Sequence, residues 1–225
     1  MQFRNRQEAG QKLAARLLPY KHEHPLILAL PRGGVPVASE VAAVLGAPLD
    51  IIVVRKLGAP GQPELGIGAV VDGDHPQSVL NEAVVRELEV SSEYLRRETQ
   101  LELEEIRRRQ ERYRGGRPRL PIEGRTVIVV DDGIATGGSM RAALRGVRRG
   151  CPKRLVLAVP VAPPDTIESL RSEVDDVVCL STPAFFQAVG QFYYDFRQTS
   201  DEEVVELLDA GRRRSEPPAP SVPRD

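Results

Sequence analysis

The chain has 225 residues, long enough for one domain with a substantial core, and its 41% hydrophobic and 28% charged residues are typical of a globular protein. Its net charge of -1 at pH 7 argues against general binding to nucleic acid or to a membrane surface. Because no apolar run approaches a membrane span and the two cysteines have no metal-like or redox-like spacing, we expect a cytoplasmic protein with reduced thiols.

Short β-branched runs alternate with amphipathic segments along most of the chain. A polar amphipathic helix without the apolar core of a signal peptide is expected first, over residues 1–17. Five runs then predict strands buried on both faces, at 26–30, 49–54, 126–130, 154–159 and 176–180. Helical spacing of apolar residues predicts helices between them, at 35–45, 139–149 and 164–173. This order predicts an α/β fold with a doubly wound, mainly parallel central sheet of about five strands.

Two segments between the second and third of these strands depart from the alternation. Residues 66–71 and 77–80 flank a DGDHP turn and predict a hairpin at the margin of the sheet. Residues 81–114 form a charge-dense helical stretch with a break near 90–92, for which Asn81 and Ser92 are the expected N-caps. Its alternating acids and arginines are most simply a solvated face, and nucleic-acid binding by the arginines is the alternative.

We expect a single domain over residues 1–210. A helical insertion occupies about 81–116, and small hood elements occupy about 183–210. The proline-rich segment 211–225 is expected to be a disordered tail.

The segment VIVVDDGIATGGSM, residues 127–140, joins a buried strand, two acids, a loop of small residues and a helix start. Ligands of doubly wound sheets bind at the carboxyl ends of strands, so Asp131 and Asp132 should face a cleft. The slim, glycine-rich loop lets successive N–H groups wrap an anion at the helix N-terminus, and Thr136 and Ser139 add hydroxyls. We therefore expect a phosphate in the loop, and hydroxyl groups or a divalent cation near the acids.

The alternative is a tight strand–helix turn in which the two acids are solvated caps. The segment lacks the lysine of a nucleotide triphosphatase loop and the G-x-G-x-x-G of a dinucleotide fold, which argues against both classes. The whole string resembles the signature of type I phosphoribosyltransferases, which bind 5-phosphoribosyl 1-pyrophosphate (PRPP). The resemblance extends over roughly residues 25–197, without the charged insertion.

This resemblance implies that Asp131 and Asp132 bind the ribose 2- and 3-hydroxyls. It assigns the 5-phosphate to the loop residues Gly133, Ala135, Thr136, Gly137, Gly138 and Ser139. It also implies a Mg²⁺ ion held mainly through PRPP, because Mg²⁺ prefers diphosphate oxygens and waters. Asp131, Asp132 and Asp195 are the candidate protein ligands of that ion.

Two further segments resemble the diphosphate-binding parts of the family. In LALPRGGVPVA, residues 28–38, a strand ends in Arg-Gly-Gly before a helix, which would place Arg32, Gly33 and Gly34 on the diphosphate; by itself this string is a turn. Arg55 and Lys56 follow the second predicted strand and resemble the Arg-Lys pair near the diphosphate.

Residues 57–66 are rich in glycine and proline and predict a mobile loop that closes over the site. Glu64 is the only ionisable side chain of this loop, and it is either catalytic or an ordinary surface acid. A closed loop would exclude water, which otherwise hydrolyses PRPP.

Six of the ten aromatic residues lie in PAFFQAVGQFYYDFR, residues 183–197. A flat nucleobase could stack there, with Phe186 and Tyr194 as candidates; a C-terminal core patch is the alternative. Asp195 also has a suggestive position in the loosely similar hood of hypoxanthine-type enzymes. Those enzymes carry an acid where this chain has Ala135, so a 6-oxopurine is disfavoured and adenine or another neutral heterocycle is favoured.

The sequence thus favours an enzyme of nucleotide or nucleoside metabolism that transfers phosphoribosyl from Mg-PRPP to a nitrogenous acceptor and releases diphosphate. PRPP and a small-molecule acceptor are the expected partners, with no nucleic acid and no membrane, and a homodimer is compatible with this interpretation. One alternative is a non-catalytic, PRPP-sensing regulator of the same fold. Another is an accessory domain that binds a different phosphosugar.

Overall fold

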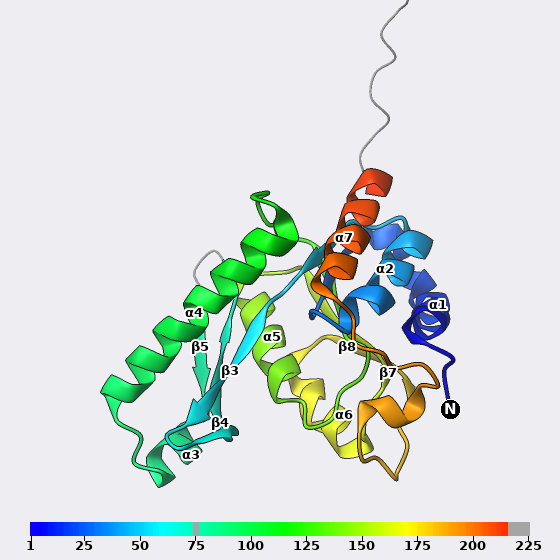
Figure 1. The fold of residues 1–225 in the computed structure, drawn as a ribbon. Helices are drawn as coiled ribbons and strands as arrows, with labels where there is room; N and C mark the ends of the chain where they lie inside the picture. The colour runs from blue at the N-terminus through cyan, green and yellow to red at the C-terminus, as the bar shows by residue number, and fades with distance from the viewer. Residues whose placement is uncertain (74–76, 216–225) are drawn as a thin grey trace, which may run out of the picture.

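A five-stranded parallel sheet forms the centre of the molecule (Figure 1). The computed structural model describes residues 1–73 and 77–215. The strand order is β2-β1-β6-β7-β8, and all four neighbouring pairs are parallel. The strands are β1 (Leu26–Ala29), β2 (Leu49–Ile51), β6 (Thr126–Val130), β7 (Arg154–Val161) and β8 (Asp176–Ser181). The predicted doubly wound sheet is confirmed.

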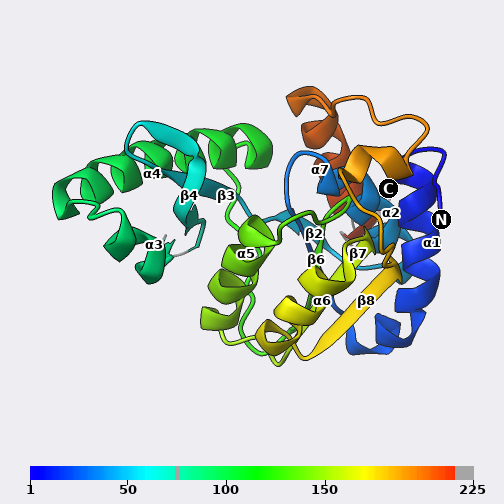
Figure 2. The same ribbon diagram turned by 90° about the horizontal axis from the view of Figure 1, so that it is seen from below.

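Helices cover both faces of this sheet (Figure 2). One face carries α1 (Arg6–Leu17), α2 (Gly34–Leu45) and α7 (Asp201–Ser215), and the other carries α5 (Gly138–Arg149) and α6 (Pro164–Leu170). Successive β6 residues alternate between these layers, with Ile128 and Val130 packed toward α1 and α2 and Val127 and Val129 toward α5. Both sets are fully buried, which explains the unbroken aliphatic run. The described part of the chain also has three short 3-10 helices: Leu18–Glu23, Arg171–Glu173 and Val189–Phe192.

A second sheet, separate from the first, contains β3 (Val54–Ala59), β4 (Gln62–Val71) and β5 (Gln77–Leu80) in antiparallel order. The predicted pair of weak strands is confirmed, but it belongs to this separate sheet and not to the margin of the central one. The expected loop at 57–66 is wrong. Those residues are the end of β3 and the start of β4, joined at Pro60 and Gly61, where Gly61 has a positive φ of 72°. Burial of Leu57 and Ile67 overrides the glycine and proline content that suggested a loop.

The predicted strand 49–54 is also divided between the two sheets. β2 ends at Ile51, and β3 begins at Val54 in the second sheet. Ile52 and Val53 between them are both buried, which is why the sequence shows one continuous apolar run.

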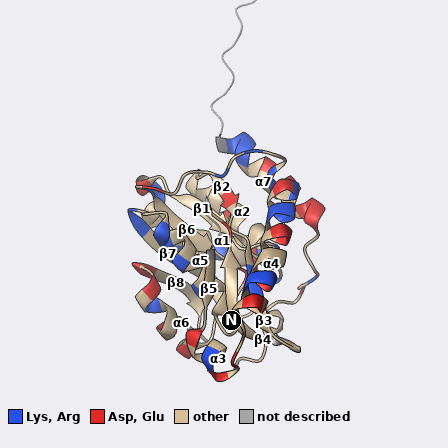
Figure 3. Cartoon of the chain, turned by 90° about the vertical axis from the view of Figure 1, so that its left-hand side faces the viewer, with Lys and Arg blue, Asp and Glu red and all other residues tan. Residues whose placement is uncertain are grey.

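The charged insertion forms α3 (Glu82–Glu87) and α4 (Ser92–Arg114), and α4 lies along the second sheet (Figure 1). The break near residue 90 and the Asn81 cap are confirmed, since the Asn81 side chain accepts from the Val84 N–H. The second cap is Ser91 rather than Ser92, because the Ser91 Oγ accepts from the Tyr94 N–H at 3.2 Å. Acids and bases alternate along α4, whereas the acids of α7 precede its arginines (Figure 3).

A buried ionic cluster joins the two sheets beside the end of α4. Arg114 donates to Asp50 Oδ1 at 3.0 Å, to Asp72 Oδ2 at 3.3 Å and to the Ile51 carbonyl at 2.8 Å. These three charged side chains are 6%, 2% and 0% exposed. Asp50 follows the first residue of β2 and Asp72 follows β4, so the cluster ties the central sheet to the second one.

The C-terminal helix α7 corrects the expected start of the disordered tail. Residues 211–215 continue this helix, and Gly211 is buried against Leu49. Val204 and Leu208 are fully buried one turn apart, while three acids begin the helix and three arginines lie in its last turn, which complements the helix dipole. The rest of the predicted tail, 216–225, lies outside the described residues. Within the part that is described, no helix is both long and apolar enough to cross a membrane.

Candidate active site

The acid pair lies at the carboxyl end of β6, the middle strand of the central sheet. Asp132 is buried and Asp131 is half-buried. The Asp132 N–H donates to Asp131 Oδ1 at 2.8 Å, and the Tyr193 hydroxyl donates to the Asp132 carbonyl at 2.5 Å. Arg6, on α1, donates from Nε to Asp132 Oδ2 at 2.7 Å. The N-terminal segment and the hood therefore hold the acid pair. The sequence did not indicate either of these contacts.

The charge state of the pair is set by its surroundings. Burial, and then the charge of neighbouring Asp132, raise the pKa of Asp131 well above its ordinary value. Burial also raises the pKa of Asp132, and the Arg6 guanidinium opposes that effect. A ligand that donates hydroxyls to these carboxylates, or that carries positive charge beside them, would favour their ionised forms.

The glycine turn after β1 touches both acids. A Cβ atom placed on Gly33 would lie 2.1 Å from Asp132 Oδ2, and one on Gly34 would lie 2.9 Å from Asp131 Cα. Only glycine fits these positions beside the acids. The fold thus brings together two motifs that are about a hundred residues apart in the sequence, as the prediction of a shared PRPP site requires.

Arg32, in the same turn, lies toward α7 and α4. Its Nη1 is 3.6 Å from Asp201 Oδ1, and the peptide bond between Pro31 and Arg32 is cis. Asp201 also accepts from the Tyr113 hydroxyl at 2.6 Å and pairs with Arg112 at 2.8 Å. These partners hold the pKa of Asp201 below its ordinary value, with the Tyr113 hydrogen bond as the largest cause.

The predicted phosphate loop leads from the acids into α5. Gly137 is its N-cap with a positive φ of 81°, a conformation that glycine adopts without strain. Thr136 and Gly138 are exposed and line a cleft of about 870 Å³, together with Lys56, Arg141 and the neighbouring part of the second sheet. The free N–H groups at the start of α5 therefore open toward a basic cleft, which suits a phosphate.

The structure separates Arg55 from Lys56. Both lie in β3, not at the end of a parallel strand, and successive strand residues point to opposite faces. Arg55 turns toward α4, where its Nε donates to Glu102 at 2.6 Å, while Lys56 lines the cleft beside Thr136. Lys56 is thus the member of the pair that shares the cleft with the phosphate loop.

Two further predicted residues are Asp195 and Glu64. Asp195 is exposed on the hood and accepts from the Arg197 N–H at 3.2 Å. No group of three metal-ligating side chains exists among the described residues, so Asp195 does not form a metal cage with Asp131 and Asp132. Glu64 lies in β4, and its side chain is outside what is described.

The hood aromatics divide into packed and exposed members. Phe186 is half-buried and packs on Phe192, with ring centroids 5.1 Å apart. Tyr194, by contrast, is 76% exposed. Phe186 therefore suits a core patch, and Tyr194 is free to stack on a ligand. Stacking on an acceptor stays a prediction.

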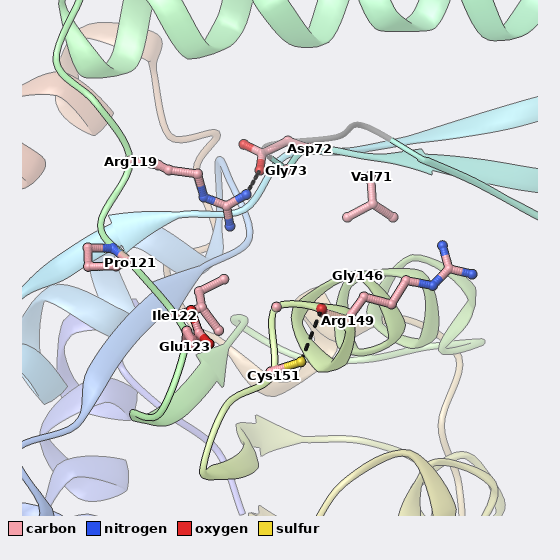
Figure 4. Close-up of a pocket in the computed structure, with 11 residues that line it drawn as sticks. Val71, Asp72, Gly73, Arg119, Pro121, Ile122, Glu123, Gly146, Arg149 and Cys151 are labelled. Atoms are coloured by element: carbon pink, nitrogen blue, oxygen red, sulfur yellow. Dashed lines mark hydrogen bonds and ion pairs between the residues drawn. The ribbon is translucent and has the colours of Figure 1, made fainter.

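A second pocket, of about 380 Å³, lies at the far end of α5 (Figure 4). Val71, Asp72, Arg119, Ile122 and Cys151 are among the residues that line it. Arg119 is directed at Asp72, at 3.8 Å, and none of the predicted site residues lines this pocket. The basic cleft at the start of α5 is therefore the better candidate active site.

The comparisons with known proteins show the family of the chain. A family model described as a phosphoribosyl transferase domain matches residues 3–197. Proteins of two Mycobacterium tuberculosis strains (CDC 1551 / Oshkosh and H37Rv), provisionally named phosphoribosyl transferases, are 48% identical over 211 residues; this is 94% of the chain but only 47% of their length. The crystal structure of TT1426 from Thermus thermophilus is 48% identical, has a TM-score of 0.80 and is matched over 92% of this chain and 98% of its own.

Proposed function

Since the chain belongs to the phosphoribosyl transferase domain family, we propose that it transfers the phosphoribosyl group of Mg-PRPP to a nitrogenous acceptor, with a nucleobase favoured. The observation that carries the proposal is the contact of the Gly33–Gly34 turn with the acid pair. It places a candidate diphosphate site directly beside a candidate ribose site. Because the chain spans about half the length of the curated relatives that it matches, the activity of a whole protein of that length is also a proposal.

The residues of the site suit each part of PRPP. Asp131 and Asp132 would accept hydrogen bonds from the ribose hydroxyls. The N–H groups of Gly133 and of residues 135–139 would hold the 5-phosphate. Lys56 and the N–H groups of the glycine turn would bind the diphosphate, and Arg32 would add its charge after a small movement away from Asp201.

The reaction breaks the bond between the anomeric carbon and the diphosphate oxygen and forms a bond from that carbon to the acceptor nitrogen. Positive charge develops on the ribose and negative charge on the departing diphosphate. The acid pair stabilises the first, and Lys56 with the backbone N–H groups stabilises the second, more strongly in the transition state than in the ground state.

Bound Mg²⁺ would supply further charge neutralisation on the diphosphate. The site fits a metal that is held through its ligand, because the described residues contain no group of three metal-ligating side chains. Diphosphate oxygens and waters would provide most of its coordination, with the acid pair nearby.

The acceptor side favours a neutral ring. Ala135 is exposed in the phosphate loop and brings no acid to the site, and Tyr194 offers an exposed aromatic face on the hood. We therefore favour adenine or a related heterocycle, in a cytoplasmic setting, over a 6-oxopurine.

A screen of nucleobases for PRPP-dependent diphosphate release tests the proposal. The Asp131→Asn, Asp132→Asn double variant should lose PRPP affinity, because each charge-assisted hydrogen bond is worth about 1.5–3 kcal/mol. Asp165→Asn, at an exposed acid of α6, is the matched control.

Three results separate the alternatives. Diphosphate release with one base, lost in the double variant, supports the transferase. Tight PRPP binding by calorimetry without turnover on any base supports the regulator instead. An unchanged PRPP affinity in the double variant contradicts the site itself.

A further inference from the structure

Arg6, the first residue of α1, binds one member of the acid pair, Asp132. Its Nε donates to Asp132 Oδ2 at 2.7 Å, and its Nη1 donates to the Arg197 carbonyl at 2.7 Å. The guanidinium also lies over the Phe196 ring, 3.9 Å from the centroid. The side chains of Arg6 and Asp132 are only 11% and 12% exposed, so this ion pair is largely removed from water.

The chain around Arg6 fixes its position. Asn5 caps α1 by accepting from the Glu8 N–H at 2.9 Å. Phe3 pairs with the hood: its N–H donates to the Phe192 carbonyl at 2.8 Å, and its carbonyl accepts from the Tyr194 N–H at 2.9 Å. Phe3 is itself fully buried. Arg6 is therefore supported on both sides before it reaches Asp132.

Asp132 is held at several points. Its Oδ2 accepts from Arg6 and lies against Gly33, and its carbonyl accepts from the Tyr193 hydroxyl. Asp131 accepts from the Asp132 N–H at its Oδ1, which lies beside Gly34. These contacts leave the second carboxylate oxygen of each acid for a ligand, so the position of Asp132 also fixes that of Asp131.

We propose that Arg6 is a positioning residue that locks Asp132 against the glycine turn and thereby fixes the acid pair for the ribose hydroxyls. This inference rests on the proposed function. Arg6 touches no substrate in this arrangement and acts through Asp132. It also balances one of two adjacent carboxylates, which would otherwise repel each other.

The test compares two ligands that differ only in the ribose. Ribose 5-phosphate can use both the phosphate loop and the acids, whereas inorganic phosphate can use only the loop. Calorimetry would measure both affinities for the full chain and for Arg6→Gln, Arg6→Lys, Asp131→Asn and Asp132→Asn. Arg4→Gln is the matched control, since the Arg4 side chain is 79% exposed two residues away.

We expect Arg6→Gln to weaken ribose 5-phosphate binding about tenfold while phosphate binding changes less than about twofold, because one charge-assisted hydrogen bond to the ribose acid is disturbed. Asp131→Asn should show the same selective loss. Arg6→Lys, which keeps the charge, should recover part of it, and Arg4→Gln should match the unmodified protein. A general structural defect would weaken both ligands equally, and that result would overturn the proposal.

Unfolding in urea tests the lock without any ligand. Arg6→Gln, Asp132→Asn and the double variant form a cycle in which the double variant should lose clearly less stability than the sum of the single ones. Additive losses would show that Arg6 does not hold Asp132. An unchanged ribose 5-phosphate affinity in Asp132→Asn would show that Arg6 does not act through this acid, and would overturn the proposal. If the cycle is coupled but the unmodified protein binds neither PRPP nor ribose 5-phosphate, the proposed function fails while the contact stands.

Discussion

Replacing Gly33 by alanine should disable the candidate site through a single methyl group. The new Cβ would lie 2.1 Å from Asp132 Oδ2 and 2.8 Å from Asp132 Cγ, whereas real Cβ atoms essentially never approach closer than 3.0 Å. Either the carboxylate or the glycine turn must move by about 0.9 Å, the difference between 3.0 and 2.1 Å. The first movement disturbs the 2.7 Å bond to Arg6, and the second moves the candidate diphosphate site.

The expected loss of folding stability in Gly33→Ala has two parts. Overpacking in a close-fitting interior costs about 1–3 kcal/mol. Loss of the charge-assisted bond from Arg6 would cost a further ~1.5–3 kcal/mol, and the two are not fully additive because the turn can share the movement. We expect a loss of stability of about 2–4 kcal/mol and PRPP binding weaker by at least about tenfold.

Urea unfolding and calorimetry with PRPP would measure the two losses. Gly66→Ala is the stability control, because a Cβ at Gly66 meets nothing within 4 Å and its φ is not in the left-handed region. If Gly33→Ala keeps both its stability and its PRPP affinity, the close approach of the turn to the acid pair is refuted.

Two further outcomes follow from the charged clusters. Arg114→Met leaves Asp50 without its partner in this cluster and Asp72 with the more distant Arg119, at 3.8 Å, and should cost about 3–5 kcal/mol in urea unfolding; a loss below about 1 kcal/mol would mean that water reaches the cluster. The hydrogen bond from Arg145 is the largest cause of a lowered pKa at Glu173. The pair therefore stabilises the fold when the pH is above the unfolded pKa of Glu173. This contribution disappears as the pH falls through the folded pKa. Glu173→Gln should therefore lose stability at pH 7, by less than ~1 kcal/mol because Arg145 is exposed. This loss should shrink steadily as the pH falls below the unfolded pKa, and a loss that does not change with pH would contradict the sign.

The central sheet could be predicted because its signals are local. Residues 127–130 of β6 are an unbroken aliphatic run followed by two acids, and a strand buried on both faces favours such residues. The hairpin of β3 and β4 could not be predicted in the same way. Its glycines and prolines indicate a loop, and only packing of Leu57 and Ile67 against the rest of the core makes the strands.

The candidate site shows the same limit. The acid pair and the phosphate loop form one continuous motif, whereas Arg6 and Tyr193 reach Asp132 from segments 126 and 61 residues away. Arginine and tyrosine are common in such segments, so nothing local marks these two. The separation of Arg55 from Lys56 was likewise hidden, because it depends on which face of β3 meets α4.

Helix α4 connects the second sheet to the start of α7. With 23 residues and a rise of about 1.5 Å per residue it is roughly 34 Å long. It binds the second sheet through the Tyr94 hydroxyl on the Gly58 carbonyl, and it binds the start of α7 through Tyr113 on Asp201. Any widening of the cleft must therefore bend this helix or break one of its attachments, so the mechanical stiffness of a segment remote from the acids limits how far the second sheet can swing.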